Sequence, residues 1–332
     1  MRRALPYVLA LAAAFAVAGV FVAAMGFNVP RAYATILFTS FRTPAGFAQT
    51  LLKFVPLLLQ ALAFTVPLAA RKFNIGGEGQ LIVGGIGAAG AGILLAGLPA
   101  PVLLPLVIAA GLVFGALWAA IPAWLLYRFQ INEILTTVLM NFVSFSLIDF
   151  VATAVWRDPA AGHPTTVPIG AGARLPLLAA SPPLHSGLLL ALLAAGLVYV
   201  YMRRTTAGYE LAATGANPRA ALIHGIAVPR IFMLALVLGG ALAGLSGAIE
   251  VAGVHHRLIE GMQSNYLLLG IIIGLIARGQ IAAVPFVAFF IAVLEVGASA
   301  MQRTMMIPAE MVFIVEALVL VFVLLSDLVR RR

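Results

Sequence analysis

A polar segment separates two long apolar runs in the first quarter of the chain. It reads FNIGGEGQL over residues 73–81 and combines Asn74, Glu78 and Gln80 with three glycines. Two amides and a carboxylate suit hydrogen bonding to a polar solute, and the glycines allow a helix break or a tight turn. We expect Asn74 to cap a helix start and Gln80 to hydrogen-bond a facing loop. Such breaks at membrane depth often lie near a transport route, whereas a short cytoplasmic turn after Arg71 is the alternative.

Two other sets of polar residues recur at helical spacing. One set follows steps of four, four and three, and consists of Glu133, Thr137, Asn141 and Ser144. This spacing places them on one helix face. Ser246 and Glu250 are likewise one turn apart. Because a charged group at the bilayer centre costs at least ~2.5–3.5 kcal/mol, such residues face protein or water rather than lipid. The two sets indicate either a water-filled path or a polar seam between helices.

The residues that commonly carry catalysis form no recognisable pattern. The five histidines are His163, His185, His224, His255 and His256. Neither HExxH nor GxSxG occurs, and the chain has no cysteine. Adjacent histidines such as the last two cannot both face one metal from a regular helix. We therefore predict no catalytic residues, no metal site and no enzyme activity, and we favour an intramembrane enzyme least among the alternatives.

The chain also lacks an ATP-binding loop. It contains no G-x-x-x-x-G-K-[ST] sequence, and its only lysines are Lys53 and Lys72. That loop cradles nucleotide phosphates in P-loop proteins. A transporter built from this chain must therefore take its energy from a partner or from an ion gradient, and we expect the chain itself to bind no cofactor.

Composition identifies the class of protein. The 332 residues are 63% hydrophobic and only 9% charged, with a mean hydropathy of +1.10, whereas soluble domains are roughly 25% charged. The apolar residues come in runs long enough to cross a ~30 Å hydrocarbon core as helices. We predict an all-α, polytopic membrane protein with a single domain over residues 1–332. The first apolar run is longer than a cleaved signal requires, so we interpret it as an uncleaved span.

About ten spans are expected along the chain. Their approximate ranges are 5–25, 49–70, 79–97, 101–127, 133–156, 186–202, 231–254, 265–278, 280–300 and 308–329. The eighth is too short to cross comfortably. Residues 26–48 and 157–184 are the long polar connections, and the second of these, rich in proline and glycine, should be an irregular external loop.

Basic residues set the expected orientation. With the N-terminus inside, thirteen of the 20 Lys and Arg residues fall on the cytoplasmic side, including the C-terminal VRRR. This agrees with the positive-inside rule, so we expect both termini to be cytoplasmic. The net charge of +9 is then explained by topology rather than by nucleic-acid binding.

The connection over residues 203–230 carries signals for a short helix. Asn217 followed by Pro218 is a typical helix start, and Gly225 is a plausible stop. We expect a two-turn helix held by a loop that contains Gly208 and Gly215. It is either an ordinary interfacial connector or a docking knob for a cytoplasmic partner.

Four motifs together resemble a known family. FNIGGEGQL, INEILTTVLMN, TTAGYELAATGANPRAALIHGI and GAIEVAGVHHRLIEGM occur in the order and at the spacing of bacterial ABC-importer permeases of the nucleoside and simple-sugar type, relatives of the ribose and branched-chain amino acid permeases. The resemblance covers roughly residues 45–330. The chain departs from the family pattern at Gly77, where alanine is more frequent, and at the approach formed by Arg71, Lys72 and Phe73.

The resemblance implies a multi-pass permease of a bacterial cytoplasmic membrane with several partners. These are a second permease subunit, usually a different chain that forms a heterodimer in this family, two cytoplasmic ATP-binding cassette subunits that use the ATP, and an extracytoplasmic substrate-binding protein. It also implies a coupling helix within residues 206–226 that docks on the ATPase. The coupling residues expected from this match are Gly208, Glu210, Gly215, Asn217, Pro218, Arg219 and Ala220.

The expected solute is a nucleoside or a simple sugar. The candidate substrate-path residues are Asn74, Glu78, Gln80, Thr137, Asn141, Ser246 and Glu250. The main alternative is an ion-coupled secondary transporter of a small polar solute, in which Asp149, Glu250 and Glu295 would serve as proton sites.

Overall fold

The computed structural model describes residues 5–306 and 313–314, 317–318, 321–322 and 325. The tenth expected span, over 308–329, falls largely outside these residues, and both termini lie outside them. Their orientation therefore remains a prediction.

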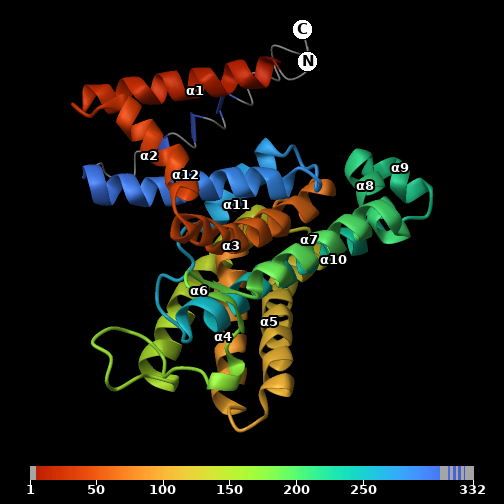
Figure 1. The fold of residues 1–332 in the computed structure, drawn as a ribbon. Helices are drawn as coiled ribbons and strands as arrows, with labels where there is room; N and C mark the ends of the chain where they lie inside the picture. The colour runs from red at the N-terminus through yellow and green to blue at the C-terminus, as the bar shows by residue number, and fades with distance from the viewer. Residues whose placement is uncertain (1–4, 307–312, 315–316, 319–320, 323–324, 326–332) are drawn as a thin grey trace.

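The described chain is almost entirely helical (Figure 1). The α-helices are α1 (Leu5–Ala24), α2 (Val29–Arg42), α3 (Pro44–Ala69), α4 (Gly77–Leu94), α5 (Ala100–Phe129), α6 (Glu133–Phe150), α7 (Gly187–Arg204), α8 (Thr206–Ala216), α9 (Pro218–Ile223), α10 (Val228–Ile249), α11 (Tyr266–Ile276) and α12 (Val284–Met305). Two π-helical turns, η1 (Val151–Val155) and η3 (Glu250–His255), extend α6 and α10. The connection between η1 and α7, expected to be external, holds a short 3₁₀ turn, η2 (Ala171–Ala173), and a hairpin of β1 (Leu177–Ala180) and β2 (Pro183–His185).

Six of the described helices are long and apolar enough to cross a membrane. They are α3, α5, α6 with η1, α7, α10 with η3, and α12. The helix α4 carries Glu78 and Gln80 in its first turn, and α11 has only 11 residues. The short eighth span is thus confirmed, whereas the expected number of about ten spans is not established by the described residues.

The segment 26–48 was predicted wrongly as a polar connection. It contains α2, in which Asn28 accepts a hydrogen bond from the backbone of Arg31 as the N-cap, and which buries Ala32 and Ile36. The remaining positions of α2 are mostly polar or exposed, so the segment is an amphipathic helix whose average polarity resembles that of a loop. As a consequence α3 begins at Pro44, earlier than the expected 49.

The core lies where α3, α4, α5 and α10 cross. In α3, 78% of the residues in the most apolar window are buried, against 22% in α7. At the crossing of α10 with α4 and α5, backbones touch directly: a Cβ on Gly244 would lie 2.8 Å from Cα of Gly115, and one on Gly247 would lie 2.8 Å from the backbone nitrogen of Gly85. The glycines of these helices therefore serve close helix packing, as small residues do in membranes.

Candidate functional site

The segment between α3 and α4 contains the predicted break. Arg71 adopts a left-handed conformation (φ 54°) and ends α3, and α4 begins at Gly77. However, Gly76 is the N-cap of α4 and no side chain caps it, so the prediction that Asn74 caps this helix is wrong.

Asn74 instead pairs with Gln80. The two buried amides exchange two hydrogen bonds of 2.8 Å, and Asn74 Oδ1 also accepts one from the backbone of Gly76 at 3.2 Å. The prediction that Gln80 hydrogen-bonds a facing loop is wrong, because both of its side-chain bonds go to Asn74 in the same segment. Two reciprocal bonds between buried amides satisfy more polar atoms than a single cap would.

The polar face of α6 closes over this segment. Asn141 Nδ2 donates to the carbonyl of Ile75 at 2.8 Å, and Asn141 Oδ1 accepts from the backbone of Gly79 at 2.9 Å. Thr137 is fully buried and donates to the Glu133 carbonyl. The spacing predicted one common face correctly, and in this structure that face forms a polar seam.

Three further contacts, missed by the sequence analysis, fix the segment. Lys72 Nζ lies 3.3 Å from Glu133 Oε2 at the start of α6 and 4.6 Å from the centre of the Phe232 ring. Gln60 Nε2 of α3 donates to the Gly77 carbonyl at 3.2 Å. That Lys72 is one of two lysines in the chain was a usable signal, whereas nothing local marks Gln60.

The glycines of the segment leave room for side chains from other helices. A Cβ on Gly79 would lie 2.9 Å from Asn141 Oδ1 and 3.1 Å from Trp118 Nε1, and a Cβ on Gly77 would lie 2.9 Å from the Leu267 side chain. Glu78, between these two glycines, is half-buried and forms no hydrogen bond or ion pair with any described residue.

The remaining two candidates lie on α10 and its π-helical extension. Asn74 faces α10 near Gly239, and Glu250 lies eleven residues further along, about 16 Å away. Ser246 is fully buried, and its hydroxyl has no hydrogen-bond partner among the described residues. The structure thus brings Asn74, Gln80, Thr137 and Asn141 together, with Glu78 adjacent in sequence, and holds Glu250 at a second place.

Glu250 borders a polar pocket of about 300 Å³. The other polar side chains of this pocket come from α3, α11 and α12 and are Gln49, Lys53, Tyr266, Ser299 and Arg303. Lys53 Nζ lies 3.3 Å from the Tyr266 hydroxyl, and Glu250 Oε2 lies 3.4 Å from His255 Nε2. Carboxylate, ammonium, amide and hydroxyl groups around one cavity can hydrogen-bond the hydroxyls of a small polar solute. The sequence signal missed here was a lysine inside an apolar span.

On the opposite end of α10, two short helices form a projection, here called the knob (residues 206–223; Figure 1). Asn217 caps α9 by accepting from the backbones of Arg219 and Ala220 at 3.1 Å, Pro218 is its first residue, and Gly225 follows with φ +83°. The predicted start and stop of this helix are confirmed.

The prediction of a loop around Gly208 and Gly215 is wrong, because both lie in α8. Thr205 caps α8 by accepting from the backbone of Gly208 at 3.1 Å. A Cβ on Gly215 would overlap the Ala69 carbonyl and lie 3.1 Å from Cα of Ala70, so α8 touches the end of α3 backbone to backbone. These glycines permit close packing rather than chain bending.

The outer surface of the knob is apolar. Tyr209, Leu222 and Ile223 are 70%, 61% and 84% exposed. A hollow of about 730 Å³ between α8 and α9 is bordered by Glu210, Asn217 and Ala220, and Arg219 is exposed beside it. Tyr209 also borders this hollow, whereas Leu222 and Ile223 lie outside its lining. Exposed large apolar side chains grouped in this way are typical of a protein interaction site.

The connection between η1 and α7 is bound to the ends of α4 and η3. Arg257 Nη1 lies 3.1 Å from Asp158 Oδ2, and Thr165 Oγ1 donates to the Leu258 carbonyl at 2.9 Å. His185 is buried against Gly253, where a Cβ would lie 2.9 Å from the ring. Burial, together with the nearby His256, lowers the pKa of His185 to about 4.

Comparison with known proteins agrees with this architecture. Residues 46–324 match the family described as branched-chain amino acid transport system / permease component. The chain is 34% identical to a glucose ABC transporter permease protein of Haloferax volcanii, over 98% of this chain and 88% of that protein. It is 30% identical to a guanosine ABC transporter permease protein of Bacillus subtilis, over 92% of this chain and 88% of that protein.

A nucleoside ABC transporter permease protein of Lactococcus lactis is 27% identical over 97% of this chain and 91% of its own length. No solved structure matches the chain significantly. With most of its length matched by the family and relatives aligned from end to end, the chain belongs to the permease-component family of branched-chain amino acid transport systems.

Proposed function

We propose that this chain is the transmembrane permease subunit of an ABC importer and forms the path for a nucleoside or simple sugar delivered by an extracytoplasmic binding protein. It would act in a bacterial cytoplasmic membrane, with both termini inside, about ten spans, a second and different permease subunit and two ATP-binding cassette subunits. Family membership and relatives whose names specify glucose, guanosine and nucleosides support this assignment.

The proposal rests mainly on the exposed apolar surface of the knob. The knob joins α7 to α10 at the side where the basic residues of the expected cytoplasmic face gather, and its exposed apolar surface centres on Ile223. A cytoplasmic ATPase that covers this surface would bury it, and each fully buried large apolar side chain stabilises an interface by roughly 1.5–3 kcal/mol. The coupling residues chosen from the sequence, from Gly208 to Ala220, lie in the two helices of the knob or cap them.

We further propose that the path has an outer and an inner part. Glu250 contacts the solute in the outer pocket, whose 300 Å³ volume is at the lower end of the range for small-molecule sites. Glu78, without a protein partner among the described residues, is the solute contact of the inner part. Asn74, Gln80, Thr137 and Asn141 form the wall that holds Glu78 in place, and Ser246 lies in the α10 wall between the two parts.

The decisive experiment reconstitutes the chain in vesicles with its partner permease, ATPase subunits and binding protein, and measures ATP-dependent uptake of glucose and guanosine. Ile223→Glu should lower ATPase association and uptake at least tenfold, because it places a charge in the contact. Leu177→Glu, at a 57% exposed position of the external hairpin, is the matched control and should leave both unchanged.

Two results would overturn the proposal. Uphill uptake by the purified chain alone, driven by a proton or sodium gradient, would establish the secondary transporter instead. Normal ATPase association of Ile223→Glu would remove the docking role of the knob, whatever the transported solute.

A further inference from the structure

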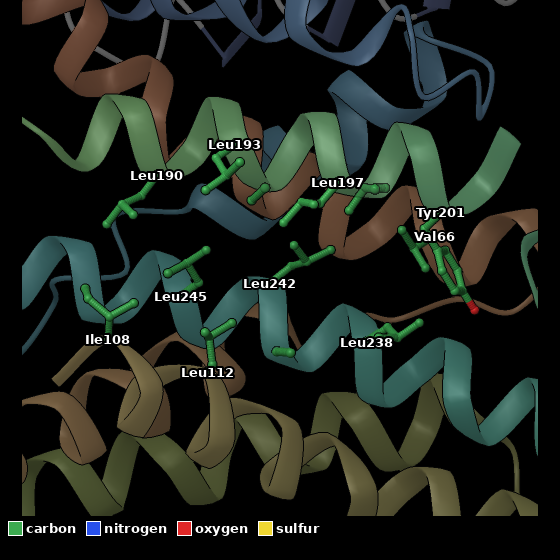
Figure 2. A pocket seen from close by; sticks show the side chains of 13 residues that line it. Val66, Ile108, Leu112, Leu190, Leu193, Leu197, Tyr201, Leu238, Leu242 and Leu245 are labelled. Atoms are coloured by element: carbon green, nitrogen blue, oxygen red, sulfur yellow. The ribbon is translucent and has the colours of Figure 1, made fainter. Parts of the chain in front are cut away.

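An apolar groove runs along α7 between this helix and α10 (Figure 2). Leucines of α7 and α10 face each other across it, and side chains of α5 and α3 complete its lining. Its volume is about 390 Å³. The α10 residues Leu242 and Leu245 are 9% and 6% exposed and form the floor, whereas Leu193 and Leu197 of α7 are 59% and 62% exposed and form the rim. The groove is thus open along its α7 rim.

The dimensions of the groove define what it can hold. From Leu190 to Tyr201 it follows eleven residues of α7, which is about 16 Å and about half of a ~30 Å hydrocarbon core. The groove therefore has the length of one extended acyl chain within a single leaflet of the bilayer.

Charge at one end of the groove indicates the kind of lipid. Arg203 and Arg204 form the last turn of α7, directly beyond Tyr201, and both are exposed. Within the described part of the chain neither forms an ion pair. Basic side chains at the cytoplasmic end of a transmembrane helix attract anionic headgroups, by about 1 kcal/mol for each residue near the surface.

We propose that this groove is a binding site for an anionic phospholipid of the cytoplasmic leaflet, with one acyl chain between α7 and α10 and the headgroup phosphate on Arg203 and Arg204. The site is distinct from the polar pocket, because the groove and that pocket share no lining residue. The bound chain fills the space between α7 and α10 next to the helices that enter the knob, and so stabilises their spacing.

The test uses the purified full-length chain after detergent delipidation. It is equilibrated with vesicles of equal parts phosphatidylglycerol and phosphatidylcholine, and the phospholipid that remains bound is identified by native mass spectrometry. We expect one retained phospholipid, with phosphatidylglycerol favoured about thirtyfold by two arginines. The R203Q/R204Q variant should retain one phospholipid with a preference near one. Ala194→Phe, at an 8% exposed position that lines the groove, should retain none.

The matched control is R31Q/R42Q, which removes the same charge from two exposed arginines of α2 and should keep the preference. Equal retention of the two lipids by the unaltered chain would mean an adventitious additive only and would refute the proposal. Retention of a second copy of the chain in place of lipid would refute it as well. Should Ala194→Phe fail to fold, the R203Q/R204Q variant still tests the proposal, because both replaced side chains are exposed. Loss of its preference for phosphatidylglycerol would support the site, and an unchanged preference would refute it.

Discussion

The close contact between α5 and α10 makes a quantitative prediction about Gly244. A Cβ added there would overlap the Gly111 carbonyl and lie 2.8 Å from Cα of Gly115. Because carbon atoms pack best at about 3.5–4.0 Å, the two helices would have to move apart by about 1 Å. Both partners at the contact are backbone, so no side chain can rotate away to absorb the change.

We expect Gly244→Ala to destabilise the protein by about 1–3 kcal/mol, the usual cost of overpacking, even though alanine favours the helix by about 1 kcal/mol. The assay is thermal unfolding in detergent, followed by the loss of monodisperse protein. Gly196→Ala in α7 is the matched control, since nothing lies within 4 Å of its added Cβ. It should be neutral or slightly stabilising.

A double-mutant cycle tests the contact itself. A Cβ on Gly111 would overlap the Ala248 side chain, so Gly111→Ala should be destabilising alone. Combining it with Ala248→Gly removes that overlap and should recover part of the loss, with a coupling of about 0.5–3 kcal/mol. If Gly244→Ala is as stable as Gly196→Ala and the cycle shows no coupling, then α5 and α10 do not pack as closely as the structure describes.

Three other predictions concern the segment, the external loop and the orientation. Asn141→Leu leaves the buried N–H of Gly79 and the part-buried carbonyl of Ile75 without partners, so we expect a loss of about 2–4 kcal/mol of stability and impaired uptake. Ser146→Ala, at an exposed position of the same helix, is the control and should leave both unchanged. Burial lowers the pKa of His185 from 6.5 to about 4, so between these pH values the unfolded chain binds a proton that the folded chain does not. The contribution of His185 to stability should therefore be complete above pH 6.5 and fall by up to about 3 kcal/mol towards pH 4. An unfolding series in which His185→Gln shows the same pH slope as the unaltered chain would refute this origin. Single cysteines at Ile223 and Gly162 of this cysteine-free chain should react only with reagents inside and outside the cell, respectively, and the reverse labelling would invert the topology.

The structure could be predicted from the sequence wherever it depends on residues that lie close together in the chain. The start of α9 follows from an asparagine side chain that accepts from two backbone groups within three residues, and from a proline that needs no hydrogen bond at that position. The common face of α6 follows from helical periodicity alone. In both cases the interacting residues lie within one or two helical turns of each other, so their spacing in the sequence is sufficient to predict the feature.

Contacts between distant segments were not predictable in the same way. The amide of Asn74 could equally cap a helix or pair with Gln80, and the choice depends on Gly76 occupying the cap position. Gly208 and Gly215 suggest a loop by composition, but their lack of a side chain is required where α8 meets backbone of α7 and α3. The polar pocket joins residues of four elements, which no spacing along the chain reveals.

These contacts also explain how a movement at the knob would reach the proposed path. Gly215 fixes α8 to Ala69 and Ala70, and the chain leaves α3 directly afterwards through Arg71 and Lys72 into the segment 74–80. That segment is bound to α6 at both of its ends, by the ion pair of Lys72 with Glu133 and by the two hydrogen bonds of Asn141. Since backbone atoms already in contact cannot be compressed, a displacement of α8 towards α3 must move the end of α3 as well. The Gly215 contact of α8 and the hydrogen bonds of the segment therefore form one connected path, along which tight packing at the knob and the hydrogen bonds of the segment would transmit a displacement to Glu78.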